Sequence, residues 1–137
     1  LSDGTLAIND RGVRSKLADW ACRQSGLKYT GMRAISALSR GETPGPENSI
    51  GKLVAGSSLQ EIAMFALDLQ GQAGAIADPK LAAMGAKFQA QLMRSPATRV
   101  EGGTDEILRN IIGERVLGLP EDMRADKGLP FNKIPTA

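Results

Sequence analysis

Apolar side chains recur every three or four residues along most of this chain, and this spacing limits the possible folds more than any other feature. It runs over residues 10–39 and 47–70, and returns in two later segments. Such spacing places the side chains on one face of an α-helix, whereas strands need an alternation that is absent here. Aromatic residues make up only 4% of the chain, so closely packed aliphatic side chains must fill the interior. The sequence predicts an all-α, up-and-down bundle of about four helices.

The first three helices are predicted from periodicity and from breaker residues. The first extends from Asp10 to Ser39, and the second from Glu47 to Gln70. The second is apolar almost all round in its later half, which places it in the middle of the bundle. Asp78 is the expected N-cap of a third helix, followed by a loop over residues 95–103. The predicted buried face of this third helix carries Leu81, Met84, Phe88 and Leu92.

Thr104 is predicted to cap a fourth helix, because its hydroxyl can accept a hydrogen bond from a free amide of the first turn. Asp105 and Glu106 follow it, where the helix dipole favours negative charge. The predicted buried stripe of this helix consists of Ile107, Leu108, Ile111, Ile112, Val116 and Leu117. The bundle domain is expected over residues 1–118, and residues 119–137, rich in proline and charge, are expected to form an extended tail.

Histidine is absent and cysteine occurs once, which excludes several kinds of site. Without histidine there is no histidine-based triad, no HExxH zinc site and no imidazole general base. Cys22 alone forms neither an intramolecular disulfide nor a multi-cysteine metal site, so no metal site is predicted and a reducing compartment is expected. Cys22 lies in a helical pattern beside Trp20 and is interpreted as an inert, semi-buried thiol.

Charge and hydropathy restrict the expected partners. A net charge of +2, with basic residues interleaved with acidic ones, argues against nucleic-acid binding. No segment approaches the roughly 20 apolar residues that cross a bilayer, and the first ten residues lack the layout of a signal peptide. We therefore expect a cytoplasmic protein with no membrane span. The chain begins with Leu1 instead of methionine, which suggests a piece of a longer polypeptide.

Residues 101–104, Glu-Gly-Gly-Thr, lead directly into the predicted fourth helix. The paired glycines Gly102 and Gly103 allow close approach to the backbone, and the exposed amides attract polar ligand atoms. The structural alternative is a loop that ends in a helix cap, which every helix needs. Asp105 and Glu106 would repel a phosphate at this point. A ligand here is therefore expected to present hydroxyl groups, as a ribityl chain or a ribose does.

Two further sets of residues are candidates for ligand contacts. The segment from Leu69 to Gly74 would let the backbone approach a flat ligand at Gly71 and Gly74, but the end of a buried helix explains the same glycines. Four arginines would form a patch for an acidic cofactor tail, or would instead solvate helix faces and pair with neighbouring acids. They are Arg94, Arg99, Arg109 and Arg115.

The segment EGGTDEILRNIIGERVLGLP, residues 101–120, closely resembles the last-helix signature of acyl-CoA dehydrogenases. The likeness extends upstream through PENSIGKLVAGSSLQEIAMFALDLQGQAG to the first long helix, so it covers most of the chain. It implies the C-terminal helical domain of that family, which usually forms the core of a tetramer. In the family this domain packs against an N-terminal helical domain and a middle β domain. Both are expected outside this chain, as is a helix just before residue 10.

The resemblance implies α,β-desaturation of an acyl-CoA thioester with FAD as cofactor. An electron-transfer flavoprotein or a similar protein would accept the electrons. Thr104 and Glu106, after the turn of Gly102 and Gly103, match family positions that hold the flavin of the same subunit. The segment from Gly71 to Gly74 matches a turn that reaches the flavin adenine of a neighbouring subunit. The resemblance therefore implies a shared site in a homo- or hetero-oligomer.

The catalytic base is the position where this chain departs from one branch of the family. That branch places a glutamate two residues before the threonine, where this chain has Gly102. The adjacent Glu101 is a candidate base one step out of register. Other branches hold the base on an earlier helix, which would lie before residue 1. Two hypotheses stay open: a domain of an active dehydrogenase whose base lies upstream, and a non-catalytic assembly subunit of a mixed tetramer.

Overall fold

The computed structural model describes residues 4–43, 45–121, 126 and 128–134. Over these residues it contains α-helices, short 3-10 helices and one π-helical turn, with no strand. The α-helices are α1 (Arg11–Ser39), α2 (Asn48–Leu69), α3 (Lys87–Val100) and α4 (Asp105–Ile111). The predicted all-α fold with four helices is confirmed.

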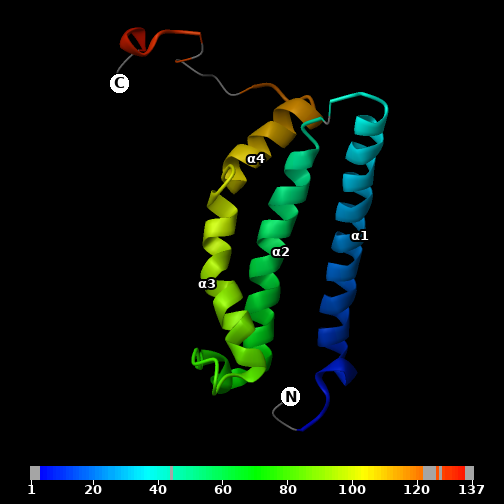
Figure 1. Ribbon diagram of the computed structural model, residues 1–137, viewed down its shortest axis with the longest axis vertical. Coiled ribbons are helices and arrows are strands. Elements are labelled where there is room, and N and C mark those ends of the chain that lie inside the picture. The colour runs from blue at the N-terminus through cyan, green and yellow to red at the C-terminus, as the bar shows by residue number, and fades with distance from the viewer. Residues whose placement is uncertain (1–3, 44, 122–125, 127, 135–137) are drawn as a thin grey trace.

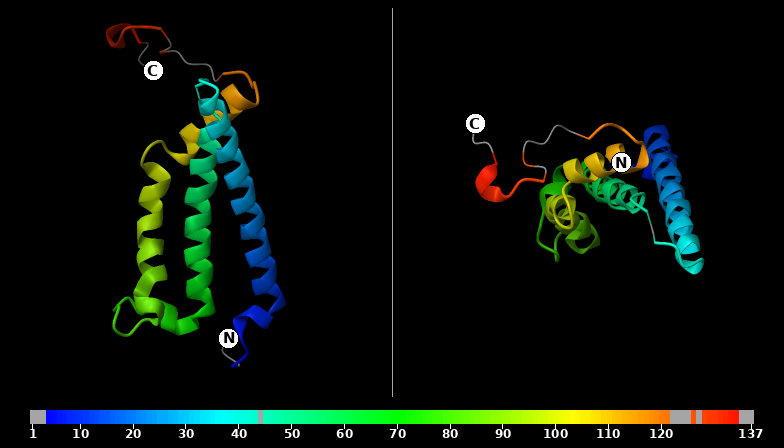
Figure 2. Two further views of the ribbon diagram at one scale, coloured as in Figure 1. Left: turned by 45° about the vertical axis from the view of Figure 1, so that its right-hand side comes forward. Right: turned by 90° about the horizontal axis from the view of Figure 1, so that it is seen from above.

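Helix α2 lies at the centre of the arrangement. Helices α1 and α3 run antiparallel to α2 on its two sides, and α4 lies beside its first turns (Figures 1 and 2). Helix α2 packs against each of the other three helices. The short connection after α1, residues 40–47, brings α2 antiparallel to it, and residues 70–86, with two 3-10 helices, return the chain to the start of α3. The predicted central position of the second helix is therefore confirmed.

Two kinds of contact hold α1 against α2. The rings of Trp20 and Phe65 meet edge to face, with centroids 5.3 Å apart and planes inclined at 81°. One carboxylate, that of Glu61 on α2, pairs with both Lys16 and Arg23 on α1, at 2.8 Å in each case. The hydrogen bond from Lys16 is the largest cause that lowers the pKa of Glu61 below its ordinary value of 4.5, and the Trp20 indole and Arg23 add to it. This carboxylate therefore stays charged at neutral pH and links the two helices.

Replacing Glu61 with glutamine should lower the free energy of unfolding by about 0.5–1 kcal/mol at pH 7, because two ion pairs at the surface are lost. Since the folded-state pKa is lowered, the contribution of Glu61 is complete above the unfolded-state pKa. It disappears as the pH falls through the folded-state value. The difference between wild type and Glu61→Gln should therefore vanish in acid. Urea unfolding at pH 7 and at pH 3 (about one unit or more below the ordinary glutamate pKa), followed by Trp20 fluorescence, measures both effects.

A matched control is Glu42→Gln. Arg40 also lowers the pKa of Glu42, by a hydrogen bond, but the two residues stand two positions apart in the connection after α1. The Arg40–Glu42 pair joins no two helices, so its loss should change the unfolding free energy less than Glu61→Gln does. Equal losses in the two variants would contradict a linking role for Glu61.

The predicted start of the third helix is wrong. Asp78 opens a tight turn instead, with its Oδ1 accepting a hydrogen bond from the Lys80 amide at 2.8 Å. Met84, Gly85 and Ala86 then all have positive φ, between 53° and 64°, so no α-helix passes through them. Helix α3 begins only at Lys87. Leu81 and Met84, predicted to be buried, are 74% and 68% exposed.

The predicted loop over residues 95–103 is also wrong over its first part, because α3 continues to Val100 with Pro96 inside it. A proline inside a helix lacks the amide that would bond the carbonyl four residues earlier, here that of Leu92. The hydroxyl of the preceding residue, Ser95, donates to this carbonyl at 2.8 Å and is itself 2% exposed. Ser95 thus satisfies the acceptor that Pro96 leaves free, and the helix tolerates the proline.

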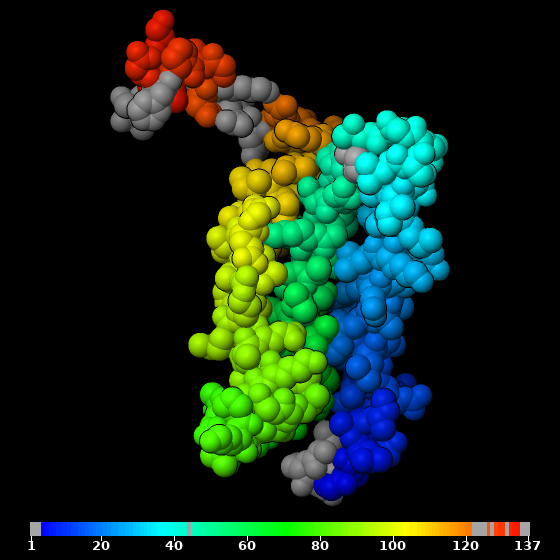
Figure 3. All heavy atoms as spheres, viewed as in Figure 1, coloured from blue at the N-terminus to red at the C-terminus, as the bar shows by residue number. Residues whose placement is uncertain are grey.

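Few apolar side chains are buried. Those of the described chain are Val13, Ala34, Ala63, Ala86 and Leu108. The accessible surface of 10078 Å² exceeds the roughly 6,900 Å² expected for a compact protein of 14.5 kDa. Atoms of α2 are still visible between α1 and α3 (Figure 3). The helices form an open layer that leaves apolar faces uncovered.

Two predictions of burial fail for this reason. In the predicted stripe of the fourth helix only Leu108 is buried, whereas Ile107 is 52% and Leu117 67% exposed. Cys22, expected to be semi-buried, is exposed. Periodicity indicates which positions of a helix are apolar but not whether a neighbouring element covers them. The exposed stripe indicates that α4 offers apolar surface beyond its contact with α2.

The boundary between a bundle over residues 1–118 and a tail over 119–137 remains a prediction. After α4, the chain forms a π-helical turn, Ile112–Val116, and later a short 3-10 turn, Phe131–Lys133. Part of the predicted tail, residues 122–125, 127 and 135–137, lies outside the described residues. None of the described helices has the length and apolar character to span a membrane.

Candidate cofactor-binding turn

The turn between α3 and α4 has the geometry that its glycines allow. After Val100, Glu101 is extended, and Gly102 and Gly103 have φ angles of 65° and 106°. These angles suit glycine far better than residues with a Cβ. A Cβ at Gly102 would meet nothing within 4 Å, so the backbone is open to approach at this residue. The turn therefore leaves room for a ligand beside its peptide groups.

Thr104 and Glu106 lie together at the start of α4. The Oγ1 atom of Thr104 accepts a hydrogen bond from the Ile107 amide at 3.3 Å, which confirms the predicted cap. The pKa of Glu106 is lowered, first by its own backbone amide, then by the Thr104 hydroxyl and by Arg109. The Glu106 side chain is 77% exposed. A half-buried hydroxyl and an exposed carboxylate thus stand side by side, an arrangement that binds ligand hydroxyls better than phosphates.

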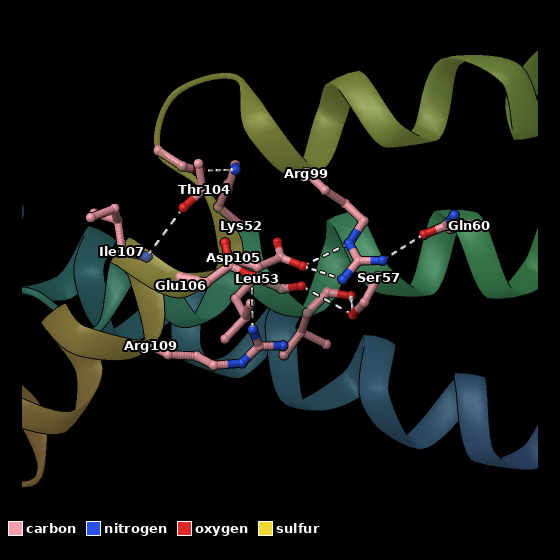
Figure 4. A network of polar contacts seen from close by, with 12 residues as sticks. Lys52, Leu53, Ser57, Gln60, Arg99, Thr104, Asp105, Glu106, Ile107 and Arg109 are labelled. Carbon is pink, nitrogen blue, oxygen red and sulfur yellow. Dashed lines mark hydrogen bonds and ion pairs between the residues drawn. The ribbon is translucent and has the colours of Figure 1, made fainter.

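Asp105, between them, has a different environment. Its side chain is 4% exposed, and its Oδ2 accepts bonds from Arg99 at 2.6 Å (Nε) and 2.5 Å (Nη2). Arg99 also donates to Gln60 of α2 at 2.7 Å, and Lys52 of α2 donates to the Gly103 carbonyl. Figure 4 shows these groups converging on the turn from α2 and α3. The turn is therefore held by polar contacts from two helices.

Most of this network is not predicted from the sequence. Lys52 and Gln60 were not singled out, and Asp105 was considered only for its charge. Helical spacing signals none of them, because the contacts join residues six to 51 positions apart. Three of the four arginines of the proposed patch are paired with acids instead: Arg94 with Glu101, Arg99 with Asp105 and Arg109 with Glu106. For these three, the alternative of pairing with neighbouring acids is the one that the structure favours.

Glu101, the candidate base, turns back along α3. Both of its carboxylate oxygens accept from Nη2 of Arg94 at 2.8 Å, and its side chain is 55% exposed. A base must be free to approach the proton that it removes. This carboxylate is instead engaged by a guanidinium, so a role as base would require that ion pair to break.

We therefore expect Glu101→Gln to change turnover of the complete polypeptide by less than about tenfold, well below the 10²–10⁴-fold loss typical for a positioned base. Steady-state kinetics with an artificial electron acceptor measure the effect. Arg94→Gln is the matched control, since it breaks the same ion pair and leaves the carboxylate in place. A loss of more than about a hundredfold confined to Glu101→Gln would assign the base to Glu101.

The segment from Gly71 to Gly74 lies at the other end of α3 from this turn (Figure 1). Helix α3 has 14 residues and separates the two segments by about 21 Å. Gly71 is exposed with a φ of 56°. Gly74 is buried, and its carbonyl accepts a hydrogen bond from Gln89 at 3.2 Å. Thus Gly71 is open to a ligand, whereas the close packing of the chain already accounts for Gly74.

Residues 2–117 match the family model described as "Acyl-CoA dehydrogenase, C-terminal domain". The chain belongs to the acyl-CoA dehydrogenase family. The resemblance inferred from residues 101–120 is thereby confirmed, and so is the assignment to the C-terminal helical domain. The acyl-CoA dehydrogenase family is generally flavin-dependent, which makes the exposed turn at Thr104 a candidate flavin contact.

Two curated relatives carry the name acyl-CoA dehydrogenase IpdE1. The protein of Mycolicibacterium smegmatis is 32% identical over 131 residues, which are 90% of this chain and 30% of the relative. The protein of Mycobacterium tuberculosis is 28% identical over 131 residues, 90% of this chain and 31% of the relative. This acyl-CoA dehydrogenase domain therefore spans about a third of the length of these relatives.

Two solved structures share the fold. One is described as the ChsE4-ChsE5 complex from Mycobacterium tuberculosis, with a TM-score of 0.73 and 25% identity over 86% of this chain and 31% of that chain. The other is described as the Tcur3481-Tcur3483 steroid ACAD, with a TM-score of 0.71 and 18% identity over 85% of this chain and 30% of that chain. Each description names two different components.

Proposed function

We propose that this chain is the C-terminal domain of a longer acyl-CoA dehydrogenase and that it contributes the turn at Thr104 and Glu106 to an FAD site. The observation that carries the proposal is the pairing of the half-buried Thr104 hydroxyl with the exposed Glu106 carboxylate beside the open backbone of Gly102. These groups fit the ribose or ribityl hydroxyls of a flavin nucleotide. The bound flavin would supply the hydride acceptor for α,β-desaturation of an acyl-CoA thioester.

We propose further that the cofactor site is shared between subunits. Gly71 is exposed, but it lies about 21 Å from the turn, at the other end of α3, so we assign it to the flavin of a neighbouring subunit. The uncovered apolar faces of the open layer support association with further protein. The two-component descriptions of both structural neighbours support a homo- or hetero-oligomer. An electron-transfer flavoprotein or a similar acceptor would reoxidise the flavin.

The experiment uses the complete polypeptide that contains this domain. We expect it to purify with FAD absorbance, and anaerobic mixing with acyl-CoA thioesters should bleach the flavin band. Linear, branched and ring-bearing acyl groups tested separately identify the substrate class. A well-folded complete polypeptide that neither binds FAD nor is bleached, alone or with its partner subunit, would contradict the proposal.

Substitutions at the turn test the residues assigned to the cofactor. Thr104→Val and Glu106→Gln should each raise the dissociation constant for FAD about five- to tenfold, the effect of losing one hydrogen bond to a polar ligand. Thr30→Val, on α1 and outside the turn, is the matched control and should leave the affinity unchanged. Wild-type affinity in both turn variants would remove Thr104 and Glu106 from the site.

A second function is favoured by one specific observation: the turn itself offers no free base. Gly102 has no side chain to accept a proton, and Glu101 is paired with Arg94. We therefore retain, as the alternative, a non-catalytic subunit that assembles with an active partner. Such a subunit would co-purify with its partner and would show no bleaching by acyl-CoA on its own. The presence of bleaching by the complete polypeptide alone would exclude it.

A further inference from the structure

Gly102 and Gly103, which open the turn to a ligand, also leave its backbone conformationally flexible. Glycine loses more conformational freedom on folding than any other residue, so a turn with two of them needs external contacts to hold one geometry. The Thr104 side chain fixes only one amide of α4, that of Ile107. The position of this turn relative to the bundle must therefore come from the contacts made by α2 and α3.

Arg99 makes the contacts that link α2, α3 and α4. It stands in the last turn of α3, donates to Gln60 of α2 and binds Asp105 at the start of α4 through two nitrogens (Figure 4). The planar guanidinium presents its donors in a rigid fork, with Nε and Nη2 toward Asp105 and Nη1 toward Gln60, whereas the donors of a lysine ammonium all lie on one freely rotating nitrogen. Arg99 therefore sets the distance between the end of α3 and the start of α4, and the turn spans that distance.

Because the Asp105 carboxylate is buried, the loss of its ion pair with Arg99 would be costly. The Asp105 side chain is 4% exposed, and its Oδ1 meets no donor within the described part of the chain. Arg99 is thus the one cation that the described residues bring to a buried anion. A buried charge that loses its partner is strongly unfavourable, so the start of α4 would move to bring Asp105 to water. Such a movement would carry the adjacent Thr104 and Glu106 with it.

We propose that Arg99 is a positioning residue that fixes the cofactor-binding turn, and through it Thr104 and Glu106, against α2. The inference rests on the proposed flavin contacts of these two residues. Arg99 need not touch the cofactor itself, since it acts through Asp105 and Gln60. The same contacts explain why the turn can be glycine-rich and open and still present its polar groups in one geometry.

The test compares Arg99→Met with Arg40→Met in the complete polypeptide. Arg40 also pairs with a carboxylate, that of Glu42, but it lies in the connection after α1, far along the sequence from the turn. The first readout is amide hydrogen exchange at residues 101–104 without flavin. We expect at least about tenfold faster exchange in Arg99→Met and less than about twofold change in Arg40→Met. The second is FAD affinity, which we expect to fall about tenfold in Arg99→Met only.

Two more variants separate positioning from charge compensation. Arg99→Lys keeps the charge beside Asp105 but lacks the rigid fork that reaches Asp105 and Gln60 through separate nitrogens, so its exchange rates and FAD affinity should lie between those of wild type and Arg99→Met. The double variant Arg99→Met, Asp105→Leu removes the unpaired anion and should recover thermal stability without recovering FAD affinity. Full recovery of affinity in the double variant would overturn the inference, as would wild-type exchange and affinity in Arg99→Met. If the wild-type protein binds no FAD, the proposed function fails, and the exchange data alone decide whether Arg99 holds the turn.

Discussion

Gly74→Ala is expected to lower the free energy of unfolding by about 2–3 kcal/mol, the upper part of the range for overpacking a closely packed site. A Cβ at Gly74 would lie 2.6 Å from the carbonyl oxygen of Leu67 and 3.2 Å from its carbonyl carbon. Both are backbone atoms at the end of α2, so no side-chain rotation relieves the clash. The turn would have to move away from the helix and break the bond from Gln89. Urea unfolding followed by Trp20 fluorescence measures the loss.

The matched control is Gly51→Ala, inside α2. A Cβ at Gly51 would meet nothing within 4 Å, and alanine is the better helix former by about 1 kcal/mol. The same substitution should therefore stabilise the chain at residue 51 and destabilise it at residue 74. Equal unfolding midpoints for wild type and Gly74→Ala would show that the end of α2 is not packed as described.

The isolated chain is expected to turn over acyl-CoA at least 10²–10⁴-fold more slowly than the complete polypeptide, which is the usual cost of losing a positioned base. Gly102 offers no base, and the carboxylate of Glu101 is held by Arg94. We also expect weak or no FAD binding by the isolated chain, because it supplies only part of the proposed site. Anaerobic flavin bleaching by the two proteins at equal FAD concentration compares the rates.

The control for this comparison is the folded state of the isolated chain. Circular dichroism should show that it is helical, so that inactivity is not a result of unfolding. The tight, stoichiometric binding of FAD by the isolated chain would contradict the division of the site between this domain and the rest of the protein. Bleaching at the rate of the complete polypeptide would place a base among these 137 residues.

The sequence predicted the helices whose ends follow local rules. Helix α1 begins after Asp10, whose Oδ1 accepts from the Val13 amide at 2.9 Å, and α4 begins after the Thr104 cap. The start of α3 could not be predicted this way, because Asp78 and Pro79 form the expected cap-and-proline pair but open a tight turn. The decisive feature is the left-handed backbone at Met84 and Ala86, which neither residue type favours.

In the candidate site, too, the residues that follow local sequence rules could be predicted, and those that depend on helix packing could not. The glycines, the Thr104 cap and the two acids after it are adjacent in sequence, so local spacing was enough to identify them. The bridge from Gln60 through Arg99 to Asp105 spans three helices, and its existence depends on how those helices pack. Burial of apolar faces failed for a related reason, since periodicity identifies which face of α4 is apolar and not what covers it.

The length of α3 has a consequence for how the protein would respond to dilution. If Gly71 touches the flavin of a neighbouring subunit while Thr104 touches that of its own, every cofactor is held from two chains at once. Separation of the subunits would then release FAD, and added FAD would in turn favour reassembly, because ligand binding and association are thermodynamically linked. Retention of the yellow colour would accordingly report the quaternary state of the protein.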